Sequence, residues 1–347
     1  MPLIGPDYAA PIRRLIAFAR LSARAHPIAF ARLSGFTALA TLASFATLGA
    51  FAGSRPLHAQ DTPESARAKQ DVLWAQMEDS VRLIAKGTDA VVGVAILDLT
   101  DRRAFYLNAD AVYPTASTIK IAILAELYRQ HGQAGAGGAK LGDLYTMDAK
   151  DVVGGSDIMG GLTPGLTRLT NRDLATMMIA VSDNSATNVL IDRVGMENVN
   201  AWLTGLGLKA TRLRRHMMDV KAAQAGRENT AAPRELVMLL EALHKGDVLG
   251  KPLTDDFFRM LGTGKTSYIP SLLPANVRTA NKPGDLDAVR NDAGIVFVPN
   301  RPFAIAVMTT FGRDERDAEL AIARITRAAW SYFDRVGKSS ALGRIVR

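Results

Sequence analysis

The hydrophobic positions of the chain change their period along its length, and this predicts where helices and strands lie. Residues 62–86 form an amphipathic helical pattern, because large apolar side chains recur at helical spacing: Leu73, Trp74, Met77, Val81 and Ile84. Residues 90–99 are rich in Val and Ile and predict a strand, which turns at residues 100–103 and returns over residues 104–107. This part of the chain therefore predicts one helix followed by a hairpin.

The last part of the chain shows the same two periods in the opposite order. Strand patterns return at residues 277–282, 294–298 and 303–310, and residues 313–336 predict a helix that is apolar on one side. Residues 140–275 show helical patterns and loops with little strand character. Strands therefore occur near both ends of the chain, with helices between them.

This order predicts an α/β fold of the α+β type. We expect an antiparallel sheet covered by the first and last helices, with an all-helical lobe inserted into it. The sheet lobe takes about residues 62–110 and 276–336, and the helical lobe takes about residues 111–275. A cleft between two such lobes is where a site is expected.

Residues 1–59 have the features of an export leader. Five arginines and one aspartate lie in residues 1–34, an uncharged apolar run covers residues 35–53, and Ala59 is a small residue suited to cleavage. The alternative is an uncleaved membrane anchor, because an apolar run of this length is just long enough to span a bilayer. We expect an exported protein, periplasmic or secreted, whose mature domain covers residues 60–347.

Charge and cysteine content exclude several classes of function. The whole chain carries +8, and the leader holds six arginines and one aspartate, so residues 60–347 carry +3 from 36 basic and 33 acidic residues. This mixed charge lacks the basic footprint of a nucleic-acid-binding protein, and we expect no nucleic-acid partner and a monomer. The chain has no cysteine, which excludes disulfides, thiolate zinc sites and a cysteine nucleophile.

The stretch Ala116-Ser117-Thr118-Ile119-Lys120 combines a nucleophile with a base. Ser117 precedes a run of helix formers, and Lys120 lies three residues later, on the same face of the helix. The helix is apolar nearly all round, so a lysine near its core loses hydration and its pKa falls. A neutral amine beside a hydroxyl can activate that hydroxyl as a nucleophile. The alternative is that Ser117 is an N-cap and Lys120 a solvated surface residue.

Two further elements carry polar side chains at places where chemistry can occur. Ser182-Asp183-Asn184 lies at the corner between two predicted helices, and Lys282-Pro283-Gly284 ends a predicted strand. Each has a simpler explanation, because Ser, Asp and Asn favour turns and Pro-Gly is a turn signal. The three elements together decide the matter.

In this order and spacing, the three elements resemble the signature of class A β-lactamases and the penicillin-recognising serine enzymes. The resemblance extends over about residues 62–336. It includes residues 174–192 around the second element, residues 230–234 at the end of an omega loop, and residues 291–296 after the third element. It implies a β-lactamase-like fold and a serine hydrolase.

The resemblance also implies the role of each site residue. Ser117 attacks the lactam carbonyl, Lys120 is its base, and Ser182 relays a proton to the leaving nitrogen. Substrate binding falls to Asn184, Lys282, Gly284 and Asp285, and the backbone N–H groups of Ser117 and Asp285 form the oxyanion hole. The implied substrate is a small β-lactam or a peptidoglycan-like molecule, and no metal or cofactor is needed.

Two positions depart from the pattern. The glutamate that activates the deacylating water in this family is matched by Met217, which is no base, and Asp219 is the displaced carboxylate that is the alternative. Glu228 and Asn229 stand where the neck of the loop usually has an aspartate, which puts the pairing of Arg215 in question. Pro283 replaces the usual Ser or Thr, so its hydroxyl and its N–H are both missing.

Three functions follow from these residues. The first is an exported β-lactamase with an acyl-enzyme on Ser117 and slow deacylation. The second is a related acyl-serine peptidase or esterase that β-lactams inhibit, and the third is a non-catalytic β-lactam-binding protein. A Ser-His-Asp hydrolase is not expected, because residues 60–347 contain only three histidines and no Gly-x-Ser-x-Gly elbow.

Overall fold

A computed structural model of the protein describes residues 63–133 and 137–345. The chain divides into two units, Met1–Leu57 and His58–Arg347, and all the described residues belong to the second. The predicted leader lies outside the described residues. Among the helices that the structure describes, none has the length and apolar character needed to cross a membrane.

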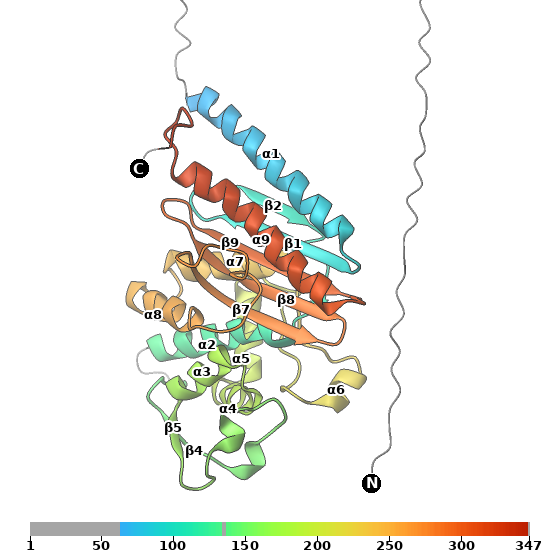
Figure 1. Ribbon diagram of the computed structural model, residues 1–347. Coiled ribbons are helices and arrows are strands. Elements are labelled where there is room, and N and C mark those ends of the chain that lie inside the picture. The colour runs from blue at the N-terminus through green and yellow to red at the C-terminus, as the bar shows by residue number, and fades with distance from the viewer. Residues whose placement is uncertain (1–62, 134–136, 346–347) are drawn as a thin grey trace, which may run out of the picture. The chain divides into compact units, whose positions relative to one another are not determined.

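The core of the fold is a five-stranded antiparallel sheet with strand order β2-β1-β9-β8-β7 (Figure 1). Its strands are β1 (Val91–Asp98), β2 (Ala104–Leu107), β7 (Arg278–Leu286), β8 (Val289–Phe297) and β9 (Phe303–Thr310). All five were predicted, but the hairpin of β7 and β8 is longer than its pattern suggests. Pro283 and Gly284 do not end β7, and the turn falls at Asp287 and Ala288, where Ala288 adopts a left-handed φ of 61°.

Two long helices cover one face of the sheet, which we call the outer face (Figure 1). They are α1 (Pro63–Gly87) and α9 (Glu315–Gly337), and they pack against each other. The predicted amphipathic positions account for this packing, because Trp74, Met77 and Val81 are all buried in one cluster with the strands. The antiparallel sheet flanked by the first and last helices is therefore confirmed.

The other face of the sheet, the inner face, packs against the segments in the middle of the chain. The helices there are η1 (Ala116–Ile119), α2 (Lys120–Gly132), η2 (Ala149–Asp151), η3 (Met159–Gly161), α3 (Asn171–Ala180), α4 (Asn184–Val194), α5 (Met196–Gly205), α6 (Val220–Gln224), α7 (Pro233–Lys245) and α8 (Lys251–Leu261). Short strands also occur, β3 (Tyr113–Pro114) with β6 (Thr230–Ala231), and β4 (Leu144–Thr146) with β5 (Arg168–Thr170). These pairs of two or three residues are too short to leave a strand pattern in the sequence.

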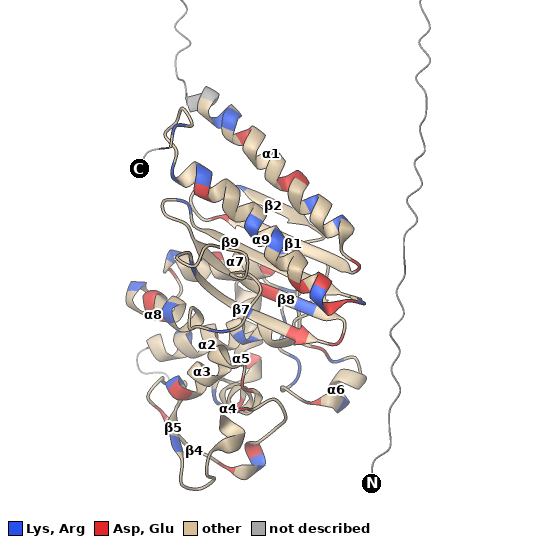
Figure 2. Ribbon diagram, in the orientation of Figure 1, with Lys and Arg blue, Asp and Glu red and all other residues tan. Residues whose placement is uncertain are grey.

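Charged residues of both signs are mixed along the ribbon of the described residues (Figure 2). Many of them pair locally, as in the bidentate pair of Arg172 with Asp256 and the pair of Arg234 with Asp110. The partly buried guanidinium of Arg290 contacts Glu319 and Glu315 at the start of α9. In each of these examples the charge of an arginine is therefore balanced by an acidic neighbour.

Candidate active site

Ser117 lies in the 3₁₀ turn η1, directly before α2. Its neighbour Ala116 has a φ of 49°, a left-handed conformation that is uncommon for a residue with a side chain. The hydroxyl of Ser117 does not cap the helix, because Ile119 occupies the N-cap of α2 and makes no side-chain cap bond. Instead, Ser117 Oγ accepts a hydrogen bond from Ser182 Oγ at 2.9 Å. The alternative of a simple capping serine is therefore wrong.

Lys120 is fully buried at the start of α2. Its Nζ donates to Ser182 O at 2.6 Å, to Ser182 Oγ at 3.0 Å and to Asn184 Oδ1 at 2.9 Å. Burial, followed by the nearby charge of Lys282, lowers the pKa of Lys120 well below its usual value, and Asp183 opposes that shift. The alternative of a solvated surface lysine is therefore wrong, and the side chain is placed and tuned as a base would be.

Ser182 lies at the centre of the polar network. It stands between α3 and α4 with a φ of 59°, and its hydroxyl accepts hydrogen bonds from Lys120 Nζ and from Lys282 Nζ, the latter at 3.1 Å. Its own proton is directed to Ser117 Oγ. A hydroxyl has one proton and two lone pairs, so this arrangement uses all of them. Among the described residues, no direct hydrogen bond joins Lys120 and Ser117, and the path between them runs through Ser182.

The side chain of Asp183 stabilises the corner at residues 182–184. Its buried carboxylate caps α4 by accepting from Ala186 N at 2.9 Å, and it also accepts from Met159 N at 2.9 Å. Asn184 closes the corner, because its Nδ2 donates to Gly154 O at 3.0 Å while its Oδ1 accepts from Lys120. This tripeptide does form a turn, as its residue types predict, and the turn directs the side chains of Ser182 and Asn184 toward Lys120.

Strand β7 brings the third element to the same place. Lys282 is 1% exposed, and besides Ser182 its Nζ contacts Pro283 O at 3.0 Å. Burial lowers the pKa of Lys282 to about 8, although the carboxylate of Asp292 opposes that shift. Gly284 has no room for a side chain, since an added Cβ would lie 2.7 Å from Thr115 O and from Thr118 N. The glycine therefore allows β7 to lie directly against the turn that carries Ser117.

The position of Pro283 fixes the direction of the neighbouring backbone N–H groups. Pro283 is opposite Asp292 in the sheet, and because proline has no N–H this pair must be a non-hydrogen-bonded one. The pattern alternates along an antiparallel ladder, so Asp285, two residues later, is again in a non-hydrogen-bonded pair. Its N–H therefore points away from β8, toward the open edge of the sheet, since β7 is the last strand.

A cavity of about 450 Å³ opens beside these residues. The predicted residues Ser117, Asn184 and Asp285 line it, and Lys120, Ser182 and Lys282 reach Ser117 through the hydrogen bonds described above. The rest of the wall comes from η1, from the end of β7 with the turn that follows it, and from residues 215–229, namely Ala116, Leu286, Asp287, Arg215, Met217, Met218, Val220, Ala223, Glu228 and Asn229. In the part of the chain that the structure describes, no group of three or more His, Asp or Glu side chains is arranged to hold a metal ion.

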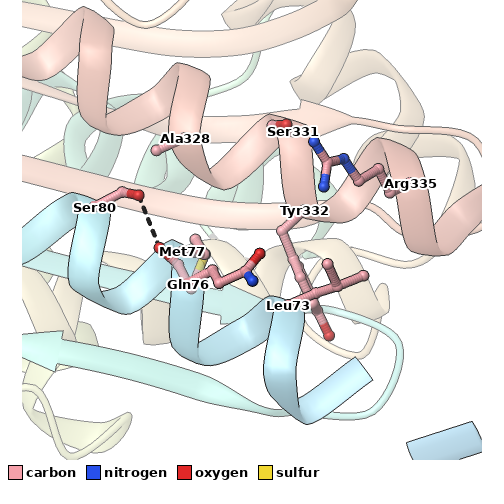
Figure 3. Close-up of a pocket in the computed structure, with 8 residues that line it drawn as sticks. All are labelled: Leu73, Gln76, Met77, Ser80, Ala328, Ser331, Tyr332 and Arg335. Atoms are coloured by element: carbon pink, nitrogen blue, oxygen red, sulfur yellow. Dashed lines mark hydrogen bonds between the residues drawn. The ribbon is translucent and has the colours of Figure 1, made fainter. Parts of the chain in front are cut away.

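A smaller cavity, of about 180 Å³, lies between α1 and α9 (Figure 3). Its polar side chains include Ser80, whose hydroxyl donates to the backbone oxygen of Gln76 on the same helix. Ser331 and Arg335 lie on the α9 side of this cavity. None of the predicted site residues lines it, so the predicted chemistry belongs to the larger cavity.

Met217, which matches the family's glutamate, and Asp219, the alternative base, differ in position. Met217 lines the cavity, and Asn188 holds its backbone from both sides, accepting from Met217 N at 2.8 Å and donating to Met217 O at 3.1 Å. Asp219 is exposed, does not line the cavity, and caps α6 by accepting from Ala222 N at 2.9 Å. The geometry therefore gives the alternative base, Asp219, no support.

An ion pair between Arg215 and Glu228 closes the neck of the loop. Glu228 Oε2 accepts from Arg215 Nη2 at 2.9 Å and from Arg215 Nε at 3.2 Å. Asn229 completes the neck, because its Oδ1 accepts from the backbone N–H groups of Arg214 and Arg215, at 2.7 and 3.0 Å. Its own carbonyl oxygen accepts from Thr115 N at 2.9 Å, two residues before the nucleophile. The substitution of the usual aspartate thus preserves the pairing of Arg215 through different atoms.

Sequence reasoning missed the positioning residues Asn188 and Tyr268, and it named Asn229 as a departure at the neck of the loop without its hydrogen-bond partners. The phenol of Tyr268 donates to Asp285 Oδ1 at 2.6 Å. Asn188 lies within the stretch around the second element that carried the family resemblance, and this was the one signal available for it. Asn229 and Tyr268 act across the fold, and nothing in their local sequence indicates their partners.

Comparison with known proteins assigns the chain to a family. The family model for the β-lactamase enzyme family matches residues 76–333. The chain belongs to the β-lactamase enzyme family. It is related to class A β-lactamases and is a β-lactamase-like serine hydrolase, so the family recognised from the three sequence elements is confirmed.

Individual relatives agree with this assignment. The chain is 30% identical over 276 residues to β-lactamase AST-1 of Nocardia asteroides, covering 78% of this chain and 84% of that protein. It is 30% identical to a β-lactamase of Streptomyces fradiae, covering 74% and 84%. Among solved structures, a β-lactamase from Sphaerobacter thermophilus has a TM-score of 0.67 at 32% identity, covering 74% of this chain and 97% of that one. A PBP-A variant, solved as an acyl-enzyme complex with penicillin G, has a TM-score of 0.67 at 25% identity, covering 75% and 97%.

Proposed function

We propose that this protein opens β-lactam rings through an acyl-enzyme on Ser117. The observation that supports this most directly is the hydrogen-bonded path from Lys120 through Ser182 to Ser117. For the relay, the two hydroxyl protons turn from the directions described above: Ser117 donates to Ser182 Oγ, and Ser182 donates to a neutral Lys120, whose two other oxygen contacts, Ser182 O and Asn184 Oδ1, carry no proton. Lys120 therefore takes the proton of Ser117 by way of Ser182.

Acylation follows from these contacts. Ser117 Oγ bonds to the lactam carbonyl carbon, and the N–H groups of Ser117 and Asp285 hold the negative oxygen that forms. The carbon–nitrogen bond then breaks, and the leaving nitrogen takes the proton held by Lys120, delivered through Ser182. Lys282 keeps Ser182 in place with a charged hydrogen bond, and Asn184 holds Lys120.

Deacylation lacks an evident base. Met217 stands in the cavity wall where a carboxylate would be needed, and its thioether is too weak an acceptor to activate water. The loss of a general base slows a step by about 10²–10⁴-fold, so release of the acyl group becomes rate-limiting. The substrate is a β-lactam or a peptidoglycan-like acyl donor, and a single chain supplies every residue of the site.

The same methionine favours a second function, that of an acyl-serine peptidase or esterase that β-lactams inhibit. Such an enzyme would deacylate its own substrate but release a penicilloyl group slowly. The complete set of Ser117, Lys120, Ser182 and Lys282 argues against a non-catalytic binding protein. We further propose that the chain is exported and cut near Ala59, which N-terminal sequencing of secreted protein tests.

The test of the proposed function is intact-protein mass spectrometry over time, after mixing with a penicillin and with a cephalosporin. We expect a covalent adduct that maps to Ser117, and product release in a burst followed by a low steady rate. A Ser117→Ala variant is the control and forms no adduct. Absence of both an adduct and turnover with the unaltered protein contradicts the proposal, and fast turnover without an adduct contradicts slow deacylation.

A further inference from the structure

A groove of about 660 Å³ lies at the start of β7, and it shares no residue with the Ser117 cavity at the other end of that strand. It is formed where α8 packs beside β7 and the end of α7 lies beside β8 (Figure 1). Its volume is in the range of pockets that bind small organic molecules. Four of the side chains that line it are cationic and one is acidic, namely Lys245, Lys251, Arg259, Arg278 and Asp255.

Three aromatic rings line one side of this groove. His244, Phe258 and Phe297 contact one another, with ring centroids 6.0 to 6.4 Å apart. Phe258 is buried, whereas His244 and Phe297 are partly exposed. Burial, followed by the charge of Arg278, lowers the pKa of His244, so this ring is neutral at pH 7. A planar group of a ligand can therefore bury against the two partly exposed rings.

Arg278 is held in the groove without the use of its hydrogen-bond donors. Its guanidinium lies over the ring of Phe297, 3.5 Å from the centroid, and this cation–π contact fixes the plane of the group. Among the described residues, no ion pair or hydrogen bond engages the guanidinium of Arg278. A guanidinium with all its N–H groups available matches two oxygen atoms of a phosphate or a carboxylate.

The two lysines of the groove are paired with carboxylates. Lys251 pairs with Asp255, one turn later on α8, at 2.9 Å. Lys245 pairs with Glu241 at 3.0 Å, but Arg102 pairs with the same carboxylate at 2.8 Å. Asp255 therefore neutralises one lysine, whereas Glu241 is divided between two cations.

The second arginine of the groove also shares its partner. Arg259 pairs with Asp256 at 2.7 Å, and Arg172 engages both oxygen atoms of that carboxylate. The loop between α7 and α8 adds one further carboxylate, that of Asp247, which does not line the groove. With these partners included, six cationic side chains stand against four carboxylates, so the surface around the groove keeps a positive charge.

We propose that this groove is a second binding site, separate from the Ser117 cavity, for a small phosphorylated molecule that carries a planar ring. The phosphate accepts hydrogen bonds from Arg278 and is attracted by Lys245 and Lys251, while the ring packs against His244 and Phe297. A phosphate monoester has three terminal oxygens and up to two negative charges, so it matches several cations better than a carboxylate does. Binding here requires no reaction at Ser117 and does not rest on the proposed function.

Isothermal titration calorimetry with phenyl phosphate, inorganic phosphate and benzoate tests this proposal. At low ionic strength we expect one molecule of phenyl phosphate to bind per chain, with a Kd that rises as salt is added. Inorganic phosphate lacks the ring and benzoate lacks the second charge, so each should bind about threefold more weakly or worse. The proposal is overturned if phenyl phosphate does not bind, or if either of the other two probes binds as tightly.

Three arginine variants locate the bound phosphate. Arg278→Gln should weaken the binding of phenyl phosphate about tenfold or more, because charged hydrogen bonds are lost, and Arg278→Lys should weaken it about threefold, because the charge stays but the planar fork is lost. Arg327→Gln is the matched control, since Arg327 also lies over an aromatic ring, that of Trp330 at 4.5 Å, but outside the groove. It should change the Kd by less than about twofold, because solvent ions screen its distant charge.

Thermal unfolding of each variant verifies that the chain is folded at the temperature of the titration. Arg278 is exposed, so its replacement should leave the melting temperature close to that of the unaltered protein. Equal affinity for phenyl phosphate in folded Arg278→Gln and in Arg327→Gln would place the bound phosphate elsewhere on the molecule, and this result overturns the proposal.

Discussion

The two faces of the sheet are built from different residues and do different work. Along β9, Phe303, Ile305 and Val307 face α1 and α9, whereas Ala304 and Ala306 face the segments that carry the site. Along this strand the outer face is filled by large side chains, whereas the inner face carries two alanines beside Met308, which allow neighbouring segments to approach closely. Both faces bury an apolar cluster, and the inner face in addition carries the polar network around Ser117.

The outer face shows how large side chains are used. Phe333 stacks on Phe303 with ring centroids 4.3 Å apart, and Trp74 meets Tyr332 edge to face at 5.1 Å. Such aromatic pairs add to the burial of apolar area, which is the main stabilising contribution in a fold. On the inner face Gly284 leaves room for η1, and the buried polar side chain of Lys282 lies near it, beside an apolar cluster that includes the Tyr128–Phe257 pair.

The largest effect on the inner face is expected from Lys120→Ala. Loss of the base should slow acylation of Ser117 by about 10²–10⁴-fold, while the melting temperature stays close to that of the unaltered protein. Labelling by a fluorescent penicillin measures the rate, and thermal unfolding provides the control. Labelling at the original rate would show that another group acts as the base.

Phe333→Ala, on the outer face, is expected to lower stability and to leave the acylation rate unchanged. Removal of a fully buried aromatic ring should lower the free energy of unfolding by about 3–5 kcal/mol, measured by denaturant titration. At a temperature where the variant is still folded, its acylation rate should equal that of the unaltered protein. A tenfold loss of acylation in the folded variant would contradict the division of work between the faces.

Met217→Glu adds a basic group to the wall of the Ser117 cavity, on the inner side of the sheet. A carboxylate at this position should speed steady turnover by about 10²-fold, at the lower end of what general-base catalysis contributes, and shorten the life of the adduct. Met217→Gln is the matched control, because it has nearly the same shape but no basic group. A gain with both variants would point to altered packing rather than to catalysis.

The pH dependence of acylation should reveal the role of Lys282. Its pKa of about 8 lies below the usual value, so Lys282 is charged below pH 8 and loses that charge as the pH rises. Acylation should therefore decline by up to tenfold above pH 8, and Lys282→Arg should move the decline to higher pH, since arginine stays protonated. An identical decline in both proteins would assign it to another group.

The same shift predicts the direction of stability with pH. Because the folded-state pKa of Lys282 is lowered, the folded chain binds fewer protons than the unfolded chain between pH 8 and the ordinary lysine value. Stability from this group therefore rises with pH across that window, and Lys282→Met should make the rise smaller, while Lys265, whose pKa burial also lowers to about 8, and Lys120 keep the remainder. Denaturant titrations at several pH values measure it, and a rise of unchanged size in the variant contradicts the assignment.

The smallest effect is expected from Asp219→Asn. Asp219 caps the short helix α6 and stays outside the cavity, so its replacement should cost about 1 kcal/mol or less and leave deacylation unaltered. Decay of the Ser117 adduct, followed by mass spectrometry, measures this. A slower decay in the variant would restore Asp219 as the deacylation base.

The sequence predicted the sheet, its covering helices and the three elements of the site, because each depends on local pattern or on a short motif. It failed where a residue acts across the fold. Pro283 and Gly284 are a turn signal by themselves, yet they lie inside β7, where an edge strand tolerates the proline and close contact requires the glycine. Asp219 and Glu228 are both near Met217 in sequence, and only the folded loop shows which of them lines the cavity.

The open edge of β7 has a consequence for the behaviour of the protein in concentrated solution. An unpaired edge strand offers its row of donors and acceptors to any extended chain, including another copy of the same protein. Pro283 interrupts that row in the middle of β7, and the carboxylates of Asp285 and Asp287 place charge at its end. The substitution that removes a hydroxyl from the site therefore also protects this edge against strand-to-strand aggregation.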